Sequence, residues 1–187
     1  AGWTTSCKRS PATPDPASRQ RRPALQAAAH NGRSRAARPR PHTTRTMPTI
    51  WKKPISLELL NQTNDRTAAT HLGIEITEVG DDFLRGRVPV DERTRQPFGI
   101  LHGGVSVVLA ETLGSIGAFY ACPEGHRGVG LDINANHIRA ASSGWVTGTA
   151  RAVHIGRTTQ VWQIDMVNDA GELTCVSRIT MAILAPR

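Results

Sequence analysis

Residues 98–117, FGILHGGVSVVLAETLGSIG, hold one carboxylate, Glu111, in a stretch that is otherwise mostly apolar or glycine. A charge in such surroundings is unfavourable unless it is paired or used, and carboxylates of this kind gather at functional sites. Ser115 follows Glu111 by four residues, so a helix would place both on one side. The carboxylate could then attack an acyl carbon or activate a water that the hydroxyl orients. A buried Glu111 that is satisfied by a partner subunit fits the same pattern.

The tripeptide His102-Gly103-Gly104 stands at the start of the apolar run, and His102 precedes Glu111 by nine residues. The first N–H groups of a helix have no internal partner and lie at the positive end of its dipole, which favours an oxyanion there. Glycine lets a carbonyl group come close to the backbone. A simple turn and helix cap would use the same residues. The G-x-S-x-G elbow of the α/β-hydrolases does not occur in the sequence, which sets that class aside.

A long helix must position these groups. The run from His102 to Tyr120 is long and apolar enough for a buried helix. Small residues predict close approach of its neighbours at Gly114, Gly117 and Ala118. A short helix is expected over residues 57–62, because Ser56 is a suitable N-cap and Glu58 favours the first turn.

The remaining segments predict strands. Residues 73–80 and 83–90 alternate apolar and polar side chains around a Gly80-Asp81-Asp82 turn, which indicates a hairpin. Four more strands are expected, at 129–140, 145–155, 158–167 and 172–184. In the first of these strands, side chains two residues apart would share one face. They are Val129, Leu131, Ile133, Ala135, His137 and Arg139. A hairpin followed by an antiparallel meander, with the long helix on one face, is an α+β fold.

The positive charge is concentrated at the beginning of the chain. The formal net charge is +8, but residues 1–46 hold ten Lys and Arg and one Asp, whereas residues 47–187 hold thirteen basic and fourteen acidic side chains. We therefore expect no nucleic-acid binding by the folded part; a basic tail could still bind nucleic acid in a salt-sensitive way. Residues 1–46 lack apolar periodicity and are predicted to be a disordered basic extension, either upstream or non-native sequence or a transit peptide. Residues 47–187 form one domain of ordinary size.

Cysteine and histidine spacing predicts neither disulfides nor a metal site. Cys7, Cys122 and Cys175 form no CxxC pair, which is typical of a reducing compartment. The histidines show no HExxH or similar ligand spacing. No uninterrupted apolar stretch reaches the roughly 20 residues of a membrane helix, and no secretory signal is seen. We expect a cytoplasmic protein that does not associate with membranes.

Three segments together carry a family resemblance: QPFGILHGGVSVVLAETLGS, VGLDINANHIR and HIGRTTQVWQIDM. They resemble the hotdog-fold acyl-CoA thioesterases with a helix-borne glutamate, a group that includes the 1,4-dihydroxy-2-naphthoyl-CoA hydrolase of menaquinone biosynthesis. The resemblance covers residues 49–184. It implies an antiparallel sheet wrapped around a long helix, and hydrolysis of an acyl-CoA, aromatic for the hydrolase just named, to the free acid and CoA without a metal or redox cofactor. It also implies a homodimer, commonly paired into a homotetramer, whose sites combine two subunits.

The resemblance also implies roles for individual residues. Glu111 matches the catalytic acid, Gly103 the oxyanion donor, and Ser115 the hydroxyl beside the acid. Gln96 and His102 match residues that hold and polarise the thioester. Positions near CoA are matched by His137, Arg139, Arg157 and Thr158, and the acyl pocket is expected at Phe98, Ile116 and Phe119.

Two questions stay open at this point. Close relatives tend to carry tyrosine where this chain has Phe119, so the acyl group is not defined, and Glu111 could act as nucleophile or as base. A non-catalytic acyl-CoA-binding or regulatory hotdog module is the alternative function, since a fold does not dictate an activity. Release of thiol from acyl-CoA would discriminate between the two.

Overall fold

The structure, a computed structural model, describes residues 49–186. The predicted basic extension, its nucleic-acid interpretation and Cys7 lie outside the described residues. The elements within them are α1 (Leu57–Thr63), α2 (Ala68–His71), β1 (Glu75–Val79), β2 (Phe83–Pro89), α3 (Gly103–Ala121), β3 (Arg127–His137), β4 (Trp145–Ile155), β5 (Thr159–Asn168) and β6 (Leu173–Leu184).

Local sequence signals predicted most of these elements. The short helix begins as expected, with the Ser56 hydroxyl oxygen accepting a hydrogen bond of 3.2 Å from the Leu59 N–H. The hairpin, the long helix and the four later strands also lie within a few residues of their predicted positions. The one-turn helix α2 was not predicted, because four residues are too few to show a helical period.

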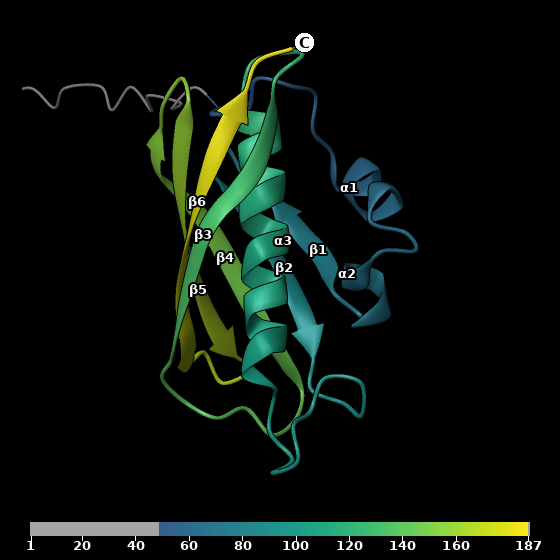
Figure 1. The fold of residues 1–187 in the computed structure, drawn as a ribbon. Helices are drawn as coiled ribbons and strands as arrows, with labels where there is room; N and C mark the ends of the chain where they lie inside the picture. Colours follow the sequence, from purple (N-terminus) through teal and green to yellow (C-terminus); the bar gives the residue numbers. More distant parts are fainter. Residues whose placement is uncertain (1–48, 187) are drawn as a thin grey trace, which may run out of the picture. The chain divides into compact units, whose positions relative to one another are not determined.

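The six strands form one antiparallel sheet in the order β1-β2-β4-β5-β6-β3. The sheet curves around α3, while α1 and α2 lie beside β1 (Figure 1). The predicted meander is wrong for β3: β4 pairs with β2, and β3 pairs with β6 at the opposite edge. The reason is that α3 carries the chain across the sheet, so that the next strand extends the far side. Within the described residues, the unpaired edges are therefore β1 and β3.

Helix α3 fills the concave side of the sheet with small residues at its closest contacts. A Cβ atom added at Gly114 would lie 2.3 Å from the Ile179 Cγ2, and one at Gly117 would lie 2.8 Å from the Trp162 ring. The missing side chains of these glycines thus leave room for side chains of the sheet, not for its backbone. By length and composition, α3 is the one helix in residues 49–186 that could span a membrane, but 56% of its apolar window is buried inside the fold. Its packing in the core explains this composition.

A bulge in β3 changes which side chains face α3. Gly130 pairs with Met181 and Asp132 with Thr180, which leaves Leu131 as the extra residue. After the bulge, Ile133 and Ala135 pack on the core as predicted.

Before the bulge the prediction is wrong. Val129 and Leu131 are 40% and 63% exposed, and the positions that face α3 are Gly128 and Gly130. The bulge reverses the alternation, so a constant period of two fails at this point.

Candidate active site

The N-terminus of α3 presents a free backbone donor. His102 is the N-cap, with φ −65° and ψ 131°, and its Nδ1 accepts a hydrogen bond of 2.9 Å from the Gly104 N–H. Within residues 49–186 the Gly103 N–H has no hydrogen-bond acceptor. This N–H lies in the first turn, where the helix dipole favours a negative charge.

A pocket of about 250 Å³ adjoins this donor and contains several of the predicted residues. Gly103, Gln96, His137 and Arg139 all line it. The His137 ring covers Gly103 so closely that a Cβ there would lie 2.8 Å from Nε2. The structure therefore brings together two predicted catalytic residues, Gly103 and Gln96. It adds to them two of the residues expected near CoA, His137 and Arg139.

Two polar side chains at this end keep hydrogen-bonding capacity. The Gln96 Oε1 accepts a hydrogen bond of 2.7 Å from the Phe98 N–H, which leaves the amide NH₂ group to donate elsewhere. His102 accepts through Nδ1, so its Nε2 carries the proton in the neutral tautomer. Both side chains can thus donate to an oxygen atom.

Glu111 lies on the flank of α3 that faces β3. It is half-buried, and its Oε1 accepts a hydrogen bond of 3.3 Å from the Ser115 hydroxyl, as the i,i+4 spacing predicted. Gly130 leaves the space for this carboxylate, since a Cβ at Gly130 would lie 3.0 Å from Oε1. Among the described residues, no cation pairs with Glu111. Sequence reasoning missed the role of Gly130, although the glycine pair at 128 and 130 was a visible signal.

Some predicted residues lie far apart within one chain. Gly103 and Glu111 are eight residues apart on one helix, or about 12 Å along its axis. Arg157 and Thr158 lie in the β4–β5 turn, where the Thr158 carbonyl accepts a hydrogen bond of 2.8 Å from the Ile183 N–H. Ile183 pairs with Gly128 near the beginning of β3, whereas His137 ends that strand. One chain therefore does not gather all of these groups around one ligand.

Known proteins match both the sequence and the fold. The model of the Thioesterase superfamily matches residues 98–175, which include Gly103, Glu111 and Ser115. The 1,4-dihydroxy-2-naphthoyl-CoA hydrolase of Escherichia coli is 51% identical over 136 residues, which cover 72% of this chain and 99% of that protein. The proofreading thioesterase EntH of Cronobacter turicensis is 47% identical over 135 residues, covering 72% of this chain and 98% of that one. The chain belongs to the thioesterase superfamily.

The crystal structure of a thioesterase from Haemophilus influenzae has a TM-score of 0.72 at 51% identity and covers 73% of this chain and 96% of that one. This match confirms the predicted hotdog fold. Other similar relatives bear names no more specific than esterase.

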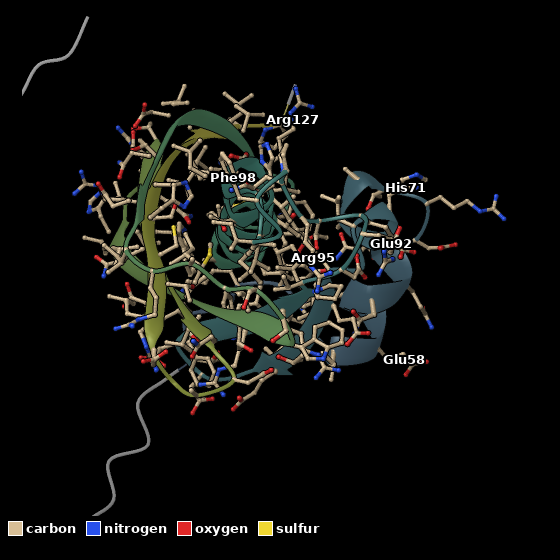
Figure 2. All side chains as sticks on the ribbon, turned by 90° about the horizontal axis from the view of Figure 1, so that it is seen from below. Glu58, His71, Glu92, Arg95, Phe98 and Arg127 are labelled. Atoms are coloured by element: carbon tan, nitrogen blue, oxygen red, sulfur yellow. The ribbon has the colours of Figure 1, made fainter. Side chains whose placement is uncertain are left out.

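The thioesterase has a second, more apolar pocket of about 330 Å³ beside Ser115. Two of the three residues expected at an acyl pocket, Ile116 and Phe119, line it. Phe98 does not: it is 88% exposed in the loop before α3, at the end of the molecule nearest the viewer in Figure 2. The opposite wall comes from α1, with Leu60, Thr63 and Asn64. Sequence reasoning missed this wall, because nothing local in α1 indicates a contact 50 residues away.

Lys53 was also missed, since the Lys52-Lys53 pair reads as surface charge. The Lys53 side chain is 8% exposed, and its Nζ donates a hydrogen bond of 2.7 Å to the His126 carbonyl oxygen. The same Nζ lies 3.6 Å from the centroid of the Phe119 ring. This buried ammonium joins the segment before α1 to the end of α3 and supports one wall of the apolar pocket.

We expect Lys53→Met to lower the free energy of unfolding of the thioesterase by about 1–3 kcal/mol, because it removes a charge-assisted hydrogen bond and leaves the His126 carbonyl with only the weak thiol donor of Cys122. Lys52→Met is the matched control: its side chain is exposed, so a change within about 0.5 kcal/mol is expected. Urea unfolding of both variants measures the difference. Equal stabilities would contradict a structural role for Lys53.

Proposed function

We propose that this thioesterase hydrolyses an aromatic acyl-CoA, with 1,4-dihydroxy-2-naphthoyl-CoA as the leading substrate, to the free acid and CoA. The observation that carries the proposal is the unpaired Gly103 N–H at the start of α3, in a pocket that it shares with Gln96. The name of the Escherichia coli relative supports the choice of substrate.

The first chemical requirement is stabilisation of the thioester oxygen as it becomes negative. The Gly103 N–H and the positive end of the helix dipole supply it, and the Gln96 amide holds the same oxygen. The Nε2–H of His102, the N-cap residue, polarises the thioester. These donors are fixed before substrate binds, because the helix cap and the Gln96–Phe98 hydrogen bond hold them.

The second requirement is a group that adds to the carbonyl carbon. Glu111 can remove a proton from a water molecule that attacks, or its own oxygen can attack and form an anhydride that water then opens. In either route the C–S bond breaks and the thiolate of CoA leaves. Ser115 holds the carboxylate and is placed to orient the water.

The distance between these two groups supports a site built from two chains. Gly103 and Glu111 are about 12 Å apart along the helix. One thioester cannot place its carbonyl oxygen at Gly103 and its carbonyl carbon at Glu111 over this distance. Glu111 lies against β3, whose outer edge has no partner strand within residues 49–186. Pairing of this edge with the same edge of a second copy would bury exposed Val129 and Leu131 surface and bring in a second α3. We therefore propose a homodimer in which Gly103 of one copy faces Glu111 of the other; two such dimers can form a tetramer.

The contacts of β3 also define the register of this pairing. On β3, Gly130 lies beside Glu111 of α3, and His137 lies beside Gly103. An antiparallel pair that places Gly130 and the bulged Leu131 opposite the partner's His137 has its two-fold axis at Asn134. The same register moves Arg139 toward the Gly128 end of the other copy, and hence toward Arg157 and Thr158. All four residues expected near CoA then lie around one ligand.

Disulfide trapping tests this register. Asp132 and the partner's Asn136 would be directly opposite each other on the exposed face of the strands, where Cβ atoms of an antiparallel pair lie about 5 Å apart. In a chain with Cys7→Ser, the double variant Asp132→Cys with Asn136→Cys should form a covalent dimer on mild oxidation. Cys122 and Cys175 are buried and should not interfere. The control is Asp132→Cys alone, and a dimer trapped equally well by this single variant would contradict the register.

Thiol release from a panel of acyl-CoAs tests the proposed activity itself. We expect the highest kcat/KM for aromatic thioesters and lower values for short and long aliphatic ones. No thiol release from any member of the panel would favour the non-catalytic module instead. We further propose that residues 47–187 form the thioesterase domain and that it works in the cytoplasm, in keeping with its unpaired buried cysteines.

A further inference from the structure

The apolar pocket begins next to the proposed catalytic carboxylate. Ser115 lines this pocket and donates its hydroxyl hydrogen to Glu111. Ile116 and Phe119 continue along α3, and Leu60 of α1 and the C-cap residue Asn64 stand opposite. An acyl group whose carbonyl is at Glu111 would therefore extend between α3 and α1.

The size and lining of the pocket define the body of this acyl group. A cavity of about 150 Å³ is enough for benzene, so a pocket of about 330 Å³ accommodates one or two fused rings. The Phe119 ring is held between the Lys53 ammonium and Tyr120, whose ring meets it edge-on at a centroid distance of 5.1 Å. A fixed aromatic wall of this kind favours a flat apolar ligand.

One polar group on the α1 wall has no use within the fold. The side chain of Asn64 is half-buried, and its amide forms no hydrogen bond within residues 49–186. The neighbouring amides are used: Asn61 bonds to the backbone of Ile76, and Gln62 bonds to Glu58. The Thr63 hydroxyl donates to the Leu59 carbonyl. Asn64 is thus free to donate to, or accept from, a ligand in the pocket.

We propose that Asn64 binds a hydroxyl or oxo substituent at the distal end of the acyl group, so that α1 gives the thioesterase a preference for ring-hydroxylated aryl thioesters. This inference rests on the proposed function, since it places the acyl group relative to Glu111. It adds a specificity-determining residue from a separate helix, one that holds the far end of the substrate and does not take part in bond cleavage.

A pair of substitutions on α1 tests the assignment in the full chain. Asn64→Leu removes the amide at a C-cap position whose φ of −79° and ψ of −5° suit leucine. Gln62→Leu is the matched control, because it removes an exposed amide of the same helix that does not line the pocket. The substrates are 4-hydroxybenzoyl-CoA with benzoyl-CoA, and 6-hydroxy-2-naphthoyl-CoA with 2-naphthoyl-CoA.

For at least one pair, we expect Asn64→Leu to lower the ratio of kcat/KM for the hydroxylated substrate to that for its parent by about 3- to 10-fold, the effect of one hydrogen bond. Gln62→Leu should leave the ratio unchanged. Asn64→Ala, a smaller change, should reproduce the loss if leucine disturbs packing. Unchanged ratios in both Asn64 variants, or an equal loss in Gln62→Leu, would overturn the inference while leaving the proposed function intact. If the native chain releases no thiol from any of the four substrates, the proposed function fails and the inference fails with it.

Discussion

Glu111→Gln should reduce kcat by about 10²–10⁴-fold, the contribution expected of a positioned acid–base group. Glutamine has the shape of glutamate, and its Oε1 can still accept the hydrogen bond from Ser115, so the fold and the binding of CoA should persist. Removal of the negative charge abolishes both routes open to Glu111, because an amide neither attacks a thioester nor takes a proton from water at neutral pH.

The measurement for this variant is steady-state thiol release, with CoA binding by calorimetry as the check on integrity. Glu124→Gln is the control, since Glu124 is exposed in the loop after α3 and lies away from the site. Turnover within a few-fold of the native value in Glu111→Gln would remove the carboxylate from the mechanism.

Gly103→Pro should reduce kcat/KM by about 10²–10³-fold, the usual effect of deleting one oxyanion donor. Proline lacks the N–H and is well tolerated at the first position of a helix. The preceding residue must then be extended, and His102 already is, with φ −65° and ψ 131°. The substitution therefore deletes the proposed donor and keeps the helix start.

Gly103→Ala is the steric control for this experiment. Both residues add a Cβ near the His137 ring, at about the 2.8 Å contact noted above, but alanine keeps the N–H. A much larger loss in the proline variant than in the alanine variant would assign the effect to the donor. Equal losses would assign it to the displaced His137 instead.

Signals within a few residues predicted the elements of this fold, and nonlocal pairing decided the rest. Ser56 marks the start of α1 and the apolar run marks α3, because capping and periodicity act within one or two turns. The sequence could not place β3 beside β6, since the strands on either side of a crossover choose partners from the whole sheet. The role of Lys53 was hidden for a similar reason, because its burial depends on the distant Phe119 and His126.

The candidate site divides in the same way. The residues on α3 and in the preceding loop were predicted as a group, because they are close in sequence and matched a known family together. The Asn64 wall and the space left by Gly130 appear only once α1 and β3 are folded against α3.

The bulge at Leu131 decides where β3 can lose a residue. Deletion of Leu131 itself would restore an uninterrupted pleat, with Gly130 and Asp132 still opposite Met181 and Thr180 and neither half of the strand turned over. Deletion of Asn134 would instead turn Ile133 or Ala135 away from the core. In a library of single-residue deletions across β3, those at the bulge should therefore preserve the free energy of unfolding far better than those after it.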